Sequence, residues 1–123
     1  MAGFTDGYEL TVLDGVFRAG YTQAPATVYV GYSVSTGTEC ADANYVRKAI
    51  TFSAASAGAI TNSGAVTFEA AAVGHNVVEC ALFTAESAGT QMTDWKALTS
   101  GTVTLTAGQQ FRLPAGDYDL TLD

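Results

Sequence analysis

The sequence has few charged side chains, and most of them are acidic. Only 14% of the 123 residues are Asp, Glu, Lys or Arg, compared with about 25% in a typical domain. Twelve acidic residues against five basic ones give a formal net charge of −7. Such a charge repels phosphate backbones and anionic lipid surfaces at long range. Neither nucleic acid nor a membrane is therefore expected as a partner.

Residues that commonly carry catalysis or bind metals are also scarce. The chain has one histidine, His75, and two cysteines, Cys40 and Cys80, with no zinc-ligand spacing among them. Sequence distance leaves open a Cys–His pair in space, but a solitary histidine is more often a polar surface residue. The glycines form neither a GxGxxG nor a Walker pattern. The sequence predicts no catalytic, metal or cofactor site, and the protein is not expected to be an enzyme.

The two cysteines are far apart in the sequence. One disulfide between them stays open, but Cys80 alternates with Val78 and Leu82 on the core face of a predicted strand. Buried free thiols are therefore the favoured prediction for both.

Long apolar runs are missing as well. No stretch approaches the ~18 consecutive apolar residues that a membrane span needs. Residues 1–6 have neither the basic segment nor the apolar run of a signal peptide. The sequence thus predicts a soluble protein that is synthesised in a cytoplasm.

The N-terminal segment, residues 1–20, has the spacing of a short amphipathic helix. Its apolar side chains recur three and four residues apart: Leu10, Leu13, Val16 and Phe17. Thr5 or Asp6 can cap this helix. Gly7 and Gly15 each cost about 1 kcal/mol relative to Ala, so the helix needs a surface to pack on. That surface is either its own domain or a neighbouring subunit.

Residues 26–123 alternate between apolar and polar side chains in short runs. The final run shows it clearly, because Tyr118, Leu120 and Leu122 fall on one face of a strand. Runs about ten residues apart, joined by short turns, are typical of a β-sandwich. We expect one domain over residues 1–123: an all-β, antiparallel, jelly-roll-like sandwich of about seven or eight short strands with one short N-terminal helix.

Asp117 and Asp119 lie two residues apart and so share the other face of that last strand. Such a pair is compatible with Ca²⁺ binding or with acid–base chemistry. The favoured interpretation is a charged solvent face that discourages edge-to-edge aggregation.

Six Tyr, six Phe and Trp95 make aromatic side chains a further candidate for binding. Several rings on one exposed face would form a sugar-binding platform. Subunit contacts are favoured instead, because Tyr suits positions where one side of the ring is packed and the other is wet.

The order of several short segments resembles a family of small tailed-phage structural proteins. The similarity covers most of the chain and includes the segments 24–30 (APATVYV), 45–52 (YVRKAITF), 62–68 (NSGAVTF), 95–98 (WKAL) and 120–123 (LTLD). Members are often labelled phage tail-fibre proteins. The resemblance also extends to minor capsid and decoration proteins of phage heads.

This resemblance implies two functions. In the first, the protein is a capsid decoration protein on the exterior of the virion, where it binds the major capsid protein and stabilises the assembled head. It would act as a homo-trimer or another homo-oligomer, with many copies adding their binding free energies. In the second, it is a tail or tail-fibre component that binds host surface glycans. The lack of long fibrous repeats favours the first.

The partner contact has two candidate locations. One is the set of strand edges, and the other is the N-terminal helix with Phe4, Tyr8 and Tyr21. The alternative for the helix is that it caps an open end of its own sandwich, and this interpretation is favoured.

Overall fold

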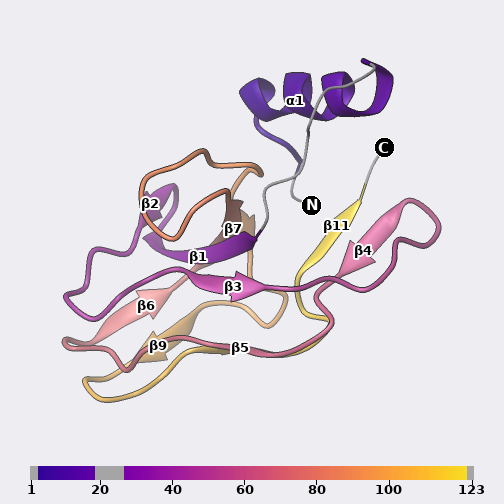
Figure 1. Ribbon diagram of the computed structural model, residues 1–123. Coiled ribbons are helices and arrows are strands. Elements are labelled where there is room, and N and C mark those ends of the chain that lie inside the picture. The colour runs from indigo at the N-terminus through magenta and orange to yellow at the C-terminus, as the bar shows by residue number, and fades with distance from the viewer. Residues whose placement is uncertain (1–2, 19–26, 122–123) are drawn as a thin grey trace.

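The computed structural model describes residues 3–18 and 27–121, with the side chains of residues 15–16 left undescribed. One helix precedes eleven short strands (Figure 1). The elements are α1 Asp6–Phe17, β1 Val28–Ser35, β2 Thr38–Glu39, β3 Lys48–Ile50, β4 Ala59–Thr61, β5 Val66–Thr67, β6 His75–Val77, β7 Glu79–Phe83, β8 Lys96–Ala97, β9 Val103–Leu105, β10 Arg112–Leu113 and β11 Asp119–Thr121.

The main sheet is built around β1. Strand β7 pairs along one edge of β1, from Tyr29 opposite Phe83 to Ser33 opposite Glu79, and β8 pairs with β7. The other edge of β1 is divided between β3 and β2, and every pairing is antiparallel. Residues 30–33 of β1 are all buried, because this strand is paired on both edges and covered on both faces.

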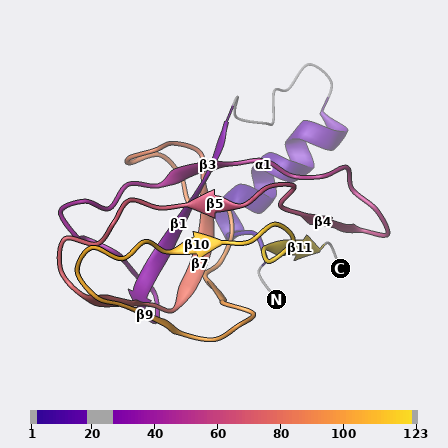
Figure 2. The same ribbon diagram turned by 90° about the horizontal axis from the view of Figure 1, so that it is seen from below.

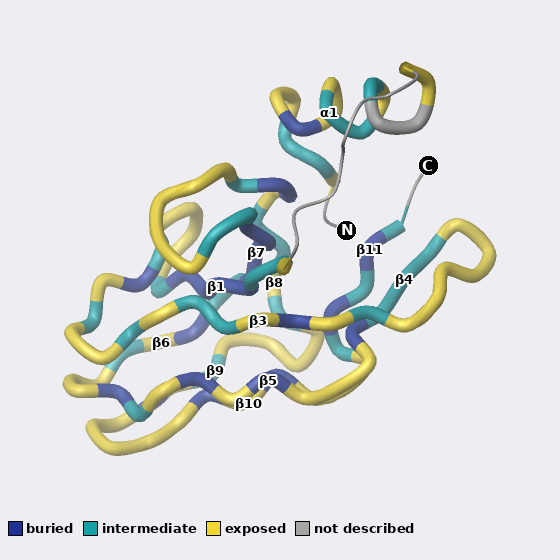
Figure 3. The backbone as a smooth tube through the Cα atoms, viewed as in Figure 1, coloured by how far each residue is buried: buried dark blue, intermediate teal, exposed yellow. Residues whose placement is uncertain are grey.

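Three two-stranded pairs complete the fold: β5 with β10, β4 with β11, and β6 with β9. Figure 2 shows β5 and β10 running across β1 and β7, so they form a second layer over the main sheet. In Figure 3 the buried backbone gathers between these layers, whereas the connecting loops are exposed.

Aromatic rings fill the space between the two layers. Tyr32 of β1 meets Phe68 and Phe111 of the second layer, with ring centroids 4.9 and 5.6 Å apart and edges turned toward faces. Phe68 and Phe111 are stacked at 5.7 Å. All three side chains are at most 5% exposed. Edge-to-face contacts at these distances are favourable beyond the apolar area that they bury.

A polar network holds the loops beside β1. Arg47 donates to both carboxylate oxygens of Glu39, at 2.8 and 2.9 Å, and its guanidinium lies 3.6 Å from the centre of the Phe83 ring. The Tyr45 hydroxyl donates to Glu39 at 2.6 Å and accepts the backbone N–H of Tyr32 at 3.1 Å. Charge-assisted, bidentate bonds of this kind fix loop geometry more firmly than neutral ones.

The predicted all-β, antiparallel, sandwich-like fold with one short N-terminal helix is confirmed. The strand number was underestimated, since the described residues contain eleven. One missed element is the hairpin that ends in β4, where Ala57 and Gly58 both have positive φ and Ser56 and Ala59 exchange backbone hydrogen bonds. A two-residue turn of this kind matches the twist of its flanking strands.

Strand structure between residues 91 and 99 is limited to β8 with isolated bridges nearby. Asp117 lies in a turn before β11, where its N–H bonds to Pro114, so it does not share a strand face with Asp119. The predicted position of Leu122 in the last strand lies outside the described residues.

Cys40 and Cys80 are free and buried, as predicted. Within residues 3–18 and 27–121, the only helix is too short to cross a bilayer.

Candidate assembly surfaces

The N-terminal segment is tied to the body before the helix starts. Asp94 donates its N–H to the carbonyl of Gly3 at 2.7 Å, and Thr5 donates its N–H to Met92 at 3.0 Å. The Thr5 hydroxyl donates to the carbonyl of Gln91 at 2.9 Å. Thr5 is the N-cap residue, as expected, but its side chain bonds to the body rather than to the helix. Helix α1 therefore leaves the body from a fixed point.

Helix α1 presents two different faces. Tyr8 is buried, and Val12 packs on the same side against the core. About half a turn away, Leu10, Leu13 and Phe17 are 66%, 54% and 78% exposed. We call these three residues the α1 stripe. The predicted spacing places Leu10, Leu13 and Phe17 on one face, as observed, whereas the side chain of Val16, the fourth residue of the predicted set, lies outside the described part of the structure. The face of α1 that packs on the body is the opposite one.

The surface of α1 is acidic. Asp6 and Glu9 lie in its first turn, where the helix dipole favours negative charge. Asp14 forms an ion pair with Arg18 at 3.2 Å. The stripe is thus an apolar surface with acidic neighbours.

Two of the three residues predicted for a partner interface, Phe4 and Tyr8, face the body of the protein. Phe4 is half-buried and Tyr8 is buried, and their rings lie 6.0 Å apart on the inward side. Tyr21 lies outside the described residues. A partner contact at these positions stays a prediction, whereas the apolar residues of α1 that are open to a partner are those of the stripe.

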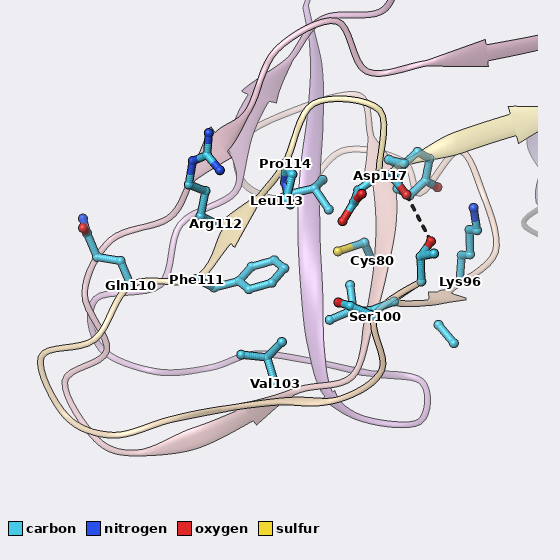
Figure 4. Close-up of a pocket in the computed structure, with 14 residues that line it drawn as sticks. Cys80, Lys96, Ser100, Val103, Gln110, Phe111, Arg112, Leu113, Pro114 and Asp117 are labelled. Atoms are coloured by element: carbon cyan, nitrogen blue, oxygen red, sulfur yellow. Dashed lines mark hydrogen bonds between the residues drawn. The ribbon is translucent and has the colours of Figure 1, made fainter.

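A pocket of about 240 Å³ opens between the segment that follows β8 and the segment around β10 (Figure 4). Its walls are mostly apolar: Cys80, Leu98, Val103, Phe111, Leu113 and Tyr118. Lys96, Arg112 and Asp117 add charge to its lining. The Thr99 hydroxyl donates to the carbonyl of Asp117 at 3.4 Å and joins the two sides.

The two cations of the pocket differ in their surroundings. Lys96 is largely buried, forms an ion pair with Asp119 and lies 5.6 Å from the centre of the Tyr118 ring. Burial lowers the pKa of Lys96, and the nearby Asp117 opposes that effect. Arg112 is exposed. Nothing in the sequence indicated this pocket, because its walls come from three segments that meet only in the fold.

His75 lies in a cluster and not on the open surface, which corrects the expectation for it. Its Nδ1 donates to the carbonyl of Val73 at 2.9 Å, so Nε2 accepts the Tyr32 hydroxyl at 2.8 Å. The Cys40 sulfur lies 3.8 Å from Nε2, and Asp42 lies 3.9 Å from Nδ1. The structure therefore brings together the Cys–His pair that sequence distance had left open.

The surroundings of this cluster do not activate the thiol. Burial raises the pKa of Cys40, which keeps it protonated, and the thiolate is the nucleophilic form. Asp42 accepts backbone N–H groups from Ala72, Asn44 and Val73, which lower its pKa. These bonds join the loop around residue 42 to the start of β6. The cluster thus cross-links two segments, and among the described residues no group of His, Cys, Asp or Glu is arranged to hold a metal ion.

Most aromatic side chains are packed inside. Trp95 lies against Phe83 with ring centroids 5.8 Å apart, and Phe52 lies against Tyr118 at 6.3 Å. Phe17 is the only exposed aromatic residue within residues 3–18 and 27–121. The described part of the chain therefore has no exposed face on which several rings gather.

A comparison with known protein families identifies a match. A family model described as "Podophage GP4 fiber I protein gp80" matches residues 3–121, which is nearly the whole chain. No curated protein matches.

Proposed function

The chain belongs to the Podophage GP4 fiber I protein gp80 family, and from this premise we propose that it is a structural subunit of the fibre apparatus of a phage virion. Family membership makes it a phage fibre-type structural protein. The proposal adds a location and a role, namely a subunit that attaches to other virion proteins through α1. The observation that carries this role is the α1 stripe, an exposed apolar surface on a helix whose start is anchored to the body.

The contrast between the exposed apolar surface of α1 and the packed β body supports this role. Burying a side chain such as Leu or Phe contributes about 1.5–3 kcal/mol, so the three stripe residues supply a modest affinity per copy. Subunits attached at several sites of one particle bind more tightly than any single contact. The packed β body would then act as a rigid unit. We propose no catalytic activity, because the one Cys–His pair holds a protonated thiol.

Capsid decoration is the second candidate. The compact two-layer domain, which lacks fibrous repeats, favours it, and its partner would be the major capsid protein. Stabilisation would then follow from mass action, since a protein that binds only the assembled lattice stabilises it by its binding free energy. Glycan recognition by the fibre is less well supported, because Phe17 alone among the described aromatic residues is exposed.

The position of the protein in the virion tests the proposal. Purified virions are labelled with an antibody against the chain and imaged, and separated heads and tails are quantified by mass spectrometry. We expect a small, symmetry-related number of copies with the fibres. Copies spread in the hundreds over the head would establish decoration instead, and absence from the particle would overturn both functions.

The role of α1 has a test of its own. Virions are assembled with Leu13→Asp, which places a charge in the stripe, or with Ala55→Asp, which places the same charge on an exposed loop. The first variant should be lost from the particles and the second retained. Equal retention of two folded variants would show that attachment does not use the stripe.

A further inference from the structure

Two apolar surfaces of the molecule are uncovered and complementary. One is the α1 stripe, and the other is the pocket between the segments around β8 and β10. In Figure 3, α1 lies at one end of the molecule, and β9 and β10, which contribute to the pocket, lie toward the other end. The helix of one copy therefore does not contact the pocket of the same copy.

The pocket has the size of an aromatic side chain. An apolar cavity of about 150 Å³ is sufficient for benzene, and sites for drug-sized ligands hold about 300–1,000 Å³. With about 240 Å³, the pocket lies between these values. Its apolar walls, which include Phe111 and Leu113, suit a phenyl ring (Figure 4). Phe17, 78% exposed, is such a ring on the chain itself.

Charge points to the same pairing. Helix α1 carries Asp6, Glu9 and Asp14, and Arg18 is the residue that follows its last turn. In the pocket Lys96 already pairs with Asp119, and Asp117 is acidic. The side chain of Arg112 points outward beside the pocket (Figure 4), so Arg112 is the exposed cation at its rim that is available to an acidic helix. Two α1 helices packed on each other would bring acidic groups together, which disfavours a contact between equivalent surfaces.

We propose that the α1 stripe of one copy docks into this pocket of the next copy, with Phe17 inserted and Arg112 facing the acidic side of the helix. Such a contact is head-to-tail and joins different surfaces, so it forms a closed ring, such as a trimer, or an open filament. The proposal rests on the attachment role proposed above for α1, because it names a second copy as the protein that α1 contacts. It does not depend on where the protein lies in the virion.

The test uses the full chain and two variants that each remove one side of the contact. Phe17→Asp places a charge in the stripe, and Ser100→Trp places a bulky ring at the exposed edge of the pocket. Analytical ultracentrifugation over a concentration series measures their masses. The wild type should associate, each variant alone should stay monomeric, and an equal mixture should form a dimer that grows no further, because it keeps one intact helix and one intact pocket.

Matched controls place the same side chains elsewhere. Val73→Asp, at another exposed apolar residue, and Ser87→Trp, on an exposed loop, should associate like the wild type. Arg112→Glu should weaken association about tenfold, most clearly at low salt. Circular dichroism confirms that each variant is folded.

Three results would overturn the proposal: a monomeric wild type at the highest soluble concentration, normal association of folded Ser100→Trp, or a mixture that stays monomeric. Normal association of Ser100→Trp together with a monomeric Phe17→Asp would indicate contact between the equivalent stripes of two copies. Virion imaging would still decide the proposed function after any of them.

Discussion

Strand β1 and helix α1 both carry regular apolar patterns, yet only one of them is covered. Residues 30–33 of β1 are all buried, with paired strands on both edges. In α1 the apolar residues Leu10, Leu13 and Phe17 are each more than half exposed. The pattern in β1 is completed by other parts of the same chain. The pattern in α1 has no covering segment among the described residues, so it is suited to a partner.

The two regions also differ in how tightly they are constrained. The loops beside β1 are held by a bidentate ion pair between Arg47 and Glu39 and by the hydroxyl of Tyr45. Helix α1 is fixed at its start by backbone bonds and packs through one face. Substitutions in the body should therefore change stability strongly, and substitutions on the outer face of α1 should not. Four predictions test this difference.

The largest effect is expected at Asn62, which is 2% exposed. Its amide donates to Gly64 and Pro114, and its Oδ1 accepts the N–H of Tyr118, all at 2.9 Å. Asn62→Ala removes these bonds and leaves a buried N–H without its acceptor. It should reduce the free energy of unfolding by about 2–4 kcal/mol, as measured by urea denaturation.

The matched control is Asn76→Ala in β6, where the exposed side chain accepts a bond from Thr104. It should reduce stability by less than about 0.5 kcal/mol. If both variants lost the same amount, the buried bonds of Asn62 would have no special importance for the body.

Two glycines provide the second comparison. A Cβ on Gly31 of β1 would collide with the Tyr45 hydroxyl and lie 3.0 Å from Glu39 and 3.1 Å from the Phe83 ring. A Cβ on Gly7 of α1 meets nothing within 4 Å. Gly31→Ala should therefore destabilise by about 1–3 kcal/mol, whereas Gly7→Ala should stabilise by about 0.5–1 kcal/mol through helix propensity. Thermal unfolding of both variants measures the difference, and effects of the same sign would contradict it.

The third prediction concerns pH and Glu39. Burial raises the pKa of Glu39, but hydrogen bonds from Arg47 and Tyr45 outweigh burial and lower the pKa below its ordinary value of about 4.5. Because the pKa of Glu39 is lower in the folded state, its charged form stabilises the protein at pH values above the ordinary pKa. This contribution disappears as the pH falls through the lowered pKa. Glu39→Gln should therefore cost about 1–2 kcal/mol at pH 7 and progressively less below pH 4.5.

Urea denaturation of both proteins between neutral and acidic pH checks this prediction. Glu86→Gln is the control, because Glu86 lies on an exposed loop. A difference between wild type and Glu39→Gln that stays constant with pH would mean that the network does not favour the charged form of Glu39.

The sequence predicts a strand well where one face of that strand is apolar and packs toward the core. Val66 and Phe68 are buried and alternate with exposed Thr67 and Glu69. It failed at the β4 hairpin, because Ala57 adopts a positive φ that alanine seldom shows. A Gly- and Ala-rich stretch carries no apolar alternation from which a strand can be predicted.

The candidate surfaces were predictable in part. The spacing of Leu10, Leu13 and Phe17 identified the stripe, because a helix places such residues on one face whatever covers them. Which face packs on the body is decided by the bonds of Thr5 to the segment near residue 91, and such long-range bonds have no local signal. The pocket and the contact of His75 with Tyr32 depend in the same way on segments that are distant in sequence.

The smallest effect is expected on the outer face of α1. Leu10→Gln combined with Leu13→Gln should change the free energy of unfolding by less than about 0.5 kcal/mol, because both side chains are exposed and Gln is a good helix former. The same substitution at Leu105, which is 4% exposed, should destabilise by more than about 1 kcal/mol because it buries an amide. Denaturation is measured at the lowest workable protein concentration, since association would add apparent stability. A loss above about 1 kcal/mol in the α1 variant would mean that the stripe is part of the fold, and the difference between a covered strand and an uncovered helix would no longer hold.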